Sequence, residues 1–116
     1  MARARIVDEV GRAAVLTLPA DRDTTATAVR YLLQLLSETA PGNTVEVRVP
    51  PFGAVQAIAG PRHTRGTPPN VIEMDAETWV AIATGELSWA AALAAGRVAA
   101  SGQRADLSDH LPVLVR

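Results

Sequence analysis

Residues 44–49 alternate strictly between valine and polar side chains, and this alternation constrains the fold more than any other feature of the sequence. Val45, Val47 and Val49 point to one side of an extended chain, and the polar residues point to the other. The pattern predicts a strand with one buried face. Residues 50–53 are too short a link for a parallel crossover, so we expect an antiparallel strand at 54–59.

Helices are predicted on the N-terminal side of this strand pair. A four-residue apolar stripe recurs at helical spacing, formed by Val29, Leu32, Leu33 and Leu36. Asp23, Thr24 or Thr25 is expected to cap this helix, and residues 41–42, Pro-Gly, end it. A shorter helix is predicted over residues 8–18, where Pro19 ends the pattern.

The sequence of the second half of the chain predicts a short strand at 71–74, two short helices and a last strand at 97–101. It also predicts a helical turn that starts at residue 106 or 108. Asp75 and Ser88 are the expected helix caps, and Gly85 and Gly96 the expected stops. Strands and helices are grouped instead of alternating, which indicates an α+β fold, a small antiparallel sheet backed by helices on one face. We expect one domain over 1–116, with 1–22 as a loosely packed helix and loop.

Composition excludes several classes of function. A hydrophobic fraction of 48% excludes disorder, and a net charge of −1 excludes the basic surface of a nucleic-acid binder. Cysteine is absent, which excludes thiol catalysis and cysteine-bound metal. The two histidines, His63 and His110, lack metal-ligand spacing, so no metal site is predicted. The serines lack a nucleophile motif and the carboxylate pairs lie at helix starts, so no catalytic residue is predicted, and no cofactor is predicted either. Without a signal sequence or a membrane span, the chain is expected in the cytoplasm, with no stable membrane insertion.

The polar segment 60–70 is the one stretch that suggests an anion site. Arg62, His63 and Arg65 supply two guanidinium groups and an imidazole beside free main-chain N–H groups. The alternative is a rigid solvated loop whose prolines fix its path. Trp79 and Trp89 leave a similar choice open, since buried indoles either fill a core or line an apolar cavity.

A sequence pattern in three parts covers residues 71–114. Asp75, Thr78 and Trp79 form a D-x-x-T-W helix start, Gly85 and Gly96 bracket a short alanine-rich helix, and GRVAASG at 96–102 leads to Leu107 and Leu111. Together with VEVRVPPFGAVQ at 45–56 and GPRHTRGTPPN at 60–70, the chain over about 28–115 resembles the sterol carrier protein type 2 family, in its bacterial, largely actinobacterial, branch. The exclusive use of arginine among the 11 basic residues is typical of GC-rich bacteria and agrees with this resemblance.

The resemblance implies a curved antiparallel sheet backed by helices, an apolar tunnel for a lipid chain or sterol, and no catalytic residues. One departure is that only four strands are predicted, where the family usually has five. Segment 60–70 stands where the further strand is expected.

The function predicted from these observations is a non-catalytic carrier of an apolar ligand, which is a lipid, fatty acyl or sterol-like molecule. The predicted cavity residues come from three elements: Trp79, Ile82, Leu93, Leu111 and Leu114. Arg62, His63 and Arg65 are the predicted contacts for a ligand head group. The alternative is an interaction module with a filled core, either a homodimer or the partner of a separately encoded enzyme. A third hypothesis is a small enzyme or anion binder that uses the segment at 62–65.

Overall fold

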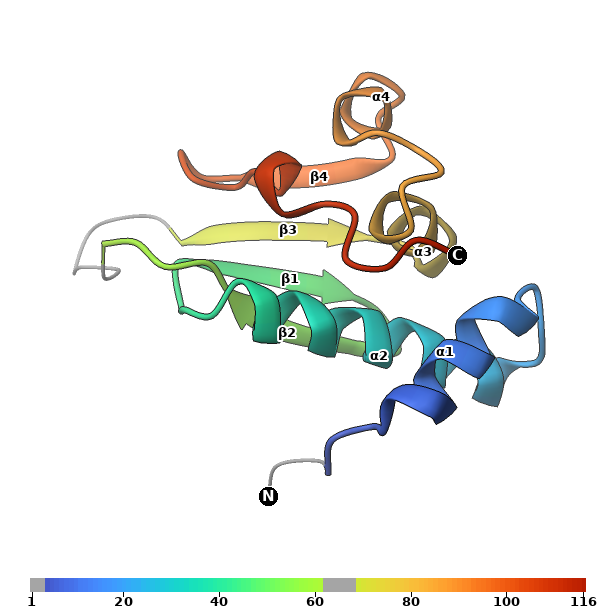
Figure 1. Ribbon diagram of the computed structural model, residues 1–116. Coiled ribbons are helices and arrows are strands. Elements are labelled where there is room, and N and C mark those ends of the chain that lie inside the picture. Colours follow the sequence, from blue (N-terminus) through green and yellow to red (C-terminus); the bar gives the residue numbers. More distant parts are fainter. Residues whose placement is uncertain (1–3, 62–68) are drawn as a thin grey trace.

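The structure, a computed structural model, describes residues 4–61 and 69–116 (Figure 1). The elements in chain order are α1 (Asp8–Thr17), α2 (Arg22–Thr39), β1 (Val45–Val49), β2 (Gly53–Ala57), β3 (Asn70–Met74), α3 (Ala76–Ala83), α4 (Trp89–Ala94), β4 (Val98–Ser101) and a single 3-10 turn (Ser108–His110). Each of these lies where the sequence predicts an element of its type. The α+β class is thereby confirmed.

The strands of the described residues form one sheet in the order β2-β1-β3-β4. The pairs β1–β2 and β3–β4 are antiparallel, as predicted, but β1 and β3 are parallel, so the sheet is mixed and not antiparallel throughout. The reason lies in the ends of the strands. Ala57 at the end of β2 and Asn70 at the start of β3 both lie beside Val45, so β3 begins where β1 begins and runs in its direction.

Helices cover one face of the sheet, as predicted, and α2 lies lengthwise over β1 and β2 (Figure 1). The three valines of β1 are buried on the covered face. Arg48, Ala54 and Gln56 are exposed on the opposite face. The alternation at 44–49 therefore places the strand in the sheet and also identifies its inner side.

Helix caps follow the predicted chemistry with one correction. The Asp75 and Ser88 side chains accept hydrogen bonds from the N–H groups of Thr78 and Ala91 at the starts of α3 and α4. The cap of α2 is Asp21, which accepts from Thr24 N at 2.8 Å, and not a residue at 23–25. The helix starts earlier than predicted because Asp21 takes the extended conformation of a cap while residues from Arg22 onward are already helical.

The N-terminal helix α1 packs on α2. Gly11, Ala14 and Val15 form its buried side. Tyr31 of α2 is fully buried against this side, and its hydroxyl donates a hydrogen bond to Asp8 at 2.8 Å. Burial and this hydrogen bond raise the pKa of Tyr31.

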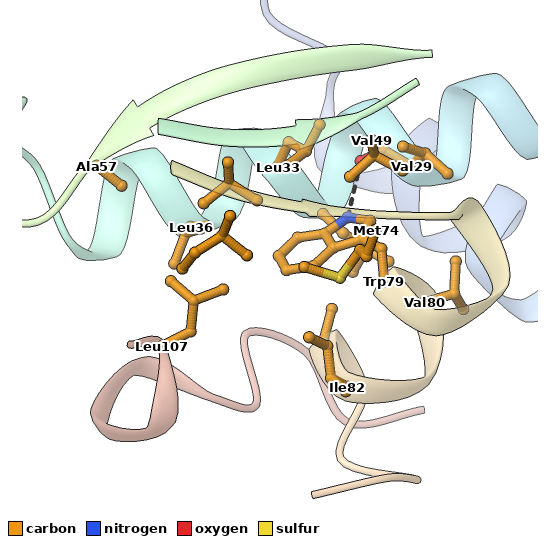
Figure 2. Close-up of a cluster of buried hydrophobic side chains, with 14 of the residues drawn as sticks. Val29, Leu33, Leu36, Val49, Ala57, Met74, Trp79, Val80, Ile82 and Leu107 are labelled. Atoms are coloured by element: carbon orange, nitrogen blue, oxygen red, sulfur yellow. Dashed lines mark hydrogen bonds between the residues drawn. The ribbon is translucent and has the colours of Figure 1, made fainter. Parts of the chain in front are cut away.

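The core lies between the sheet and the covering helices (Figure 2). Trp79 of α3 reaches its centre, where the indole N–H donates to the main-chain oxygen of Val29 in α2 at 3.3 Å. Leu107, from the segment after β4, closes the same cluster with no exposed surface. No helix of the described residues is long and apolar enough to cross a membrane.

Candidate functional site

The structure gathers four of the five predicted cavity residues around α3. Trp79 and Ile82 are fully buried in the core (Figure 2). Leu111 and Leu114, from the C-terminal segment, are half-buried and pack against the same core. Leu93 does not join them, because its side chain on α4 is 41% exposed. A binding role for these five residues stays a prediction.

The C-terminal segment, residues 111–116, is held across α3 by a small number of hydrogen bonds and one ion pair, in addition to the packing of its apolar side chains. The N–H groups of Val113 and Leu114 both donate to the Ala83 carbonyl, at 2.8 and 3.2 Å. Arg116 forms an ion pair with Glu86, which lowers the pKa of that carboxyl, and donates to the Val15 carbonyl of α1 at 2.9 Å. The segment thus forms the outer wall of the part of the core that contains Ile82.

A second feature, which the sequence did not predict, is a cleft of about 780 Å³ between α2, β2 and residues 4–6. Its apolar wall consists of Ile6, Leu33, Phe52 and Val55. Its polar wall is formed by Arg5, Thr27, Arg30, Gln34, Ser37 and Glu38. None of the five predicted cavity residues lines it. The available signal was the polar spacing of residues 27, 30, 34 and 38 along one side of the predicted helix.

The two ends of this cleft differ in charge. At one end Arg5 is held by Glu38 at 2.6 Å and by Asp8 at 3.1 Å, and the ion pair with Arg5 lowers the pKa of the Glu38 carboxyl. The Gln34 side chain completes this end by accepting from Ile6 N and donating to Ile6 O, at 2.8 and 2.9 Å. The guanidinium of Arg5 is therefore already paired within the chain.

The other end of the cleft is cationic. Arg30, which lines the cleft, donates from Nε to the Phe52 carbonyl at 2.7 Å. Arg22 is not a lining residue, but its guanidinium lies 5.7 Å from the centre of the Phe52 ring. Neither arginine forms an ion pair with any carboxylate of the described residues. Two guanidinium groups without a counter-charge therefore flank Phe52.

Two predictions concern polar chemistry. Arg62, His63 and Arg65 lie outside the described residues, so their predicted contact with a ligand head group stays a prediction. Across residues 4–61 and 69–116, no group of three or more histidine, aspartate or glutamate side chains is arranged to hold a metal ion.

The architecture is that of a small α+β domain, with an open mixed sheet, helices on one face and an apolar core between them. The family model described as "Bacterial SCP ortholog" matches residues 21–113, and the chain belongs to this bacterial sterol carrier protein family. The resemblance noted in the sequence is thereby confirmed. Comparison with the curated proteins finds no match.

Proposed function

We propose that this protein is a non-catalytic carrier of an apolar ligand, of the lipid, fatty acyl or sterol-like class, in the cytoplasm. The observation that carries the proposal is the family match, which spans α2 to the C-terminal segment. Helices α2, α3 and α4 and all four strands of the described sheet lie within the matched residues. Burial of an acyl chain contributes about 0.8 kcal/mol per methylene, so a short chain binds usefully without a polar anchor.

The ligand site we propose lies between α3 and the C-terminal segment. Trp79 and Ile82 would form its inner wall, and Leu111 and Leu114 its outer wall. This space is filled by side chains in the present conformation, so the segment would move outward as ligand enters. The small number of hydrogen bonds that fasten residues 111–114 supports such a movement, because both main-chain bonds end on the Ala83 carbonyl. The exposed Leu93, on the neighbouring α4, would lie at the entrance.

Titration of a fluorescent fatty acid tests the carrier function. We expect saturable binding to the parent protein and at least fivefold weaker binding to Leu93→Trp, whose larger side chain would obstruct the entrance. Leu16→Trp is the matched control, because Leu16 on α1 is 67% exposed and belongs to no proposed site. Failure of fatty acids, acyl thioesters and sterols to bind saturably would contradict the carrier function.

A reversible crosslink tests the moving segment. A Cβ at position 85 would lie 3.4 Å from the Cβ of Pro112, close to the separation found in disulfides. Since the chain has no other cysteine, Gly85→Cys with Pro112→Cys gives one defined crosslink. The oxidised variant should lose ligand binding and the reduced variant should recover it. Equal binding in both states would place the ligand elsewhere.

The second candidate function is an interaction module with a filled core. The observation that favours it is the close packing of Trp79 and Ile82, both without exposed surface. A protein that binds none of the three ligand classes and keeps a stable fold would support this alternative.

A further inference from the structure

The cleft between α2 and β2 contains an unpaired strand edge. β2 is the outermost strand of the described sheet, so one side of its main chain has no partner strand there. The Phe52 carbonyl at the start of this edge already accepts a hydrogen bond from Arg30. Alternate residues of a strand direct their main-chain groups to the same side. The N–H and C=O groups of Ala54 and Gln56, both exposed residues, therefore face the same edge.

The walls of the cleft suit a peptide better than an acyl chain. Arg30, Gln34 and Ser37 line it beside the apolar Leu33 and Val55. Gln34 and Ser37 already bond within the chain, to Ile6 and to the Gln34 carbonyl, and Arg30 Nε donates to the Phe52 carbonyl. An acyl chain would still cover the other N–H groups of Arg30 and the free main-chain groups of Ala54 and Gln56 without bonding them, at about 1–3 kcal/mol for each buried group. An extended peptide has a donor and an acceptor at each residue and apolar side chains on alternate positions. The free main-chain edge of β2 and the apolar wall of the cleft would then both have a partner.

The charge of the cleft sets the direction of such a peptide. A strand that adds antiparallel to β2 has its C-terminal end beside Phe52, where β2 begins. Arg30 lines the cleft at that end, and Arg22 lies outside the lining, beside the Phe52 ring. Neither arginine has a carboxylate partner among the described residues. Arg5, at the opposite end, is already paired with Glu38. A guanidinium binds a carboxylate by charge-assisted and often bidentate hydrogen bonds.

We infer that this cleft is a partner site that binds the C-terminal tail of another protein. The tail adds as a strand antiparallel to β2, and its terminal carboxylate is held by Arg30 and Arg22. Main-chain pairing with Ala54 and Gln56 supplies the affinity, and the apolar wall at Leu33 and Val55 selects side chains. This site is separate from the proposed lipid site, which lies around α3.

A peptide selection tests this inference. Synthetic hexapeptides, with Gly-Gly followed by four randomised positions and a free C-terminal carboxylate, are passed over the immobilised full chain, and retained peptides are identified by mass spectrometry. We expect retention of peptides rich in β-branched and apolar residues, and much less retention by an Arg30→Gln column. A retained peptide is then labelled and its affinity measured by fluorescence anisotropy.

Three changes to that peptide and protein define the mode of binding. Replacing the terminal carboxylate by an amide should weaken binding about tenfold or more, and Arg30→Gln should weaken the acid peptide equally. The amide peptide should bind Arg30→Gln no worse than it binds the parent, which separates lost charge pairing from a damaged cleft. N-methylation should abolish binding at alternate peptide positions only, since only alternate N–H groups face β2. Arg48→Gln, on the exposed face of β1, is the control and should change affinity less than twofold.

Four results would overturn the inference. The first is that no peptide is retained more strongly by the parent column than by the Arg30→Gln column. The second is equal binding of the acid and amide peptides. The third is protection of the Ala54 and Gln56 amides from hydrogen exchange in the free protein together with a dimer in sedimentation, which would place a second copy at this edge. The fourth is Arg30-dependent displacement of the peptide by decanoate, which would make the cleft a lipid site.

Discussion

The ring of Tyr31 occupies the space that any side chain at position 11 would need. A Cβ built on Gly11 would lie 2.1 Å from two ring carbons of Tyr31, well inside van der Waals contact. Two helices thus approach closely because one of them has a glycine at the crossing point. This glycine sits inside α1, where alanine would otherwise be favoured by about 0.5–1 kcal/mol.

Gly11→Ala should therefore destabilise the protein although it improves the helix propensity of α1. We expect a net loss of about 2 kcal/mol in the free energy of unfolding, because the overpacking penalty exceeds the propensity gain. Urea denaturation measures the loss. Gly53→Ala is the matched control, since a Cβ there meets its nearest atoms at 3.6 Å, an ordinary contact. Equal stability of the two variants would show that α1 can move away from α2 at no cost.

The buried face of β1 leads to a second prediction. Val47 has no exposed surface, whereas Ala54, opposite Arg48 on the outer face of the neighbouring strand, is exposed. Val47→Asp should cost more than about 4 kcal/mol, because an unpaired charge enters an apolar layer. Ala54→Asp should change stability by less than about 0.5 kcal/mol. Thermal unfolding compares the two, and a Val47→Asp variant that melts with the parent would contradict the assignment of the buried face.

Much of this fold could be predicted because its signals are local. The alternation at 44–49 predicts a strand, and the glycines at 85 and 96 predict helix ends, from residues that are close together in the sequence. Each predicted element is present in the structure. The parallel pairing of β1 with β3 was missed because it depends on the end of the sheet at which β3 begins, which no local pattern determines. The cleft was missed for a related reason. Its walls come from three separated segments, and Arg30 and Phe52 become neighbours only in the folded chain.

Trp79 supports a third prediction about the core. Its indole N–H donates to the Val29 carbonyl from a fully buried position. Trp79→Phe removes both the donor and part of the ring, and should cost about 2–3 kcal/mol through lost packing and a lost hydrogen bond. Trp89→Phe is the comparison, since Trp89 is 7% exposed and makes no side-chain hydrogen bond among the described residues. In denaturant unfolding, Trp89→Phe should lower the free energy of unfolding by at least about 1 kcal/mol less than Trp79→Phe does.

The cap of α3 predicts a pH-dependent contribution to stability. Hydrogen bonds from Thr78 to Asp75 hold the pKa of the Asp75 carboxyl below its ordinary value. A carboxyl with a lowered pKa stabilises the fold above its unfolded pKa, and this contribution is lost as the pH falls through the folded pKa. Asp75→Ala should therefore cost about 1 kcal/mol at pH 7 and progressively less below about pH 4. Glu77→Ala in the same turn is the control, and a pH-independent loss at Asp75 would contradict the charge-assisted cap.

Two glycines that flank β4 separate backbone strain from steric conflict, and their comparison gives the last prediction. Gly96 and Gly102 have φ of 70° and 103°, which side chains resist. A Cβ on Gly96 would meet nothing within 4 Å, whereas one on Gly102 would lie 2.4 Å from the Asn70 side chain and 2.9 Å from the Asn70 Cα.

Gly96→Ala should lower the free energy of unfolding by about 1 kcal/mol, because the backbone conformation at position 96 is unfavourable for alanine. Ala95→Gly is the control for exchanging alanine and glycine at the end of α4. Gly102→Ala should cost at least about 2 kcal/mol, because Asn70 would also have to give up its hydrogen bonds to Thr44 and Arg104. The unfolding free energies of the three variants measure the difference, and equal losses at 96 and 102 would mean that the contact with Asn70 contributes nothing.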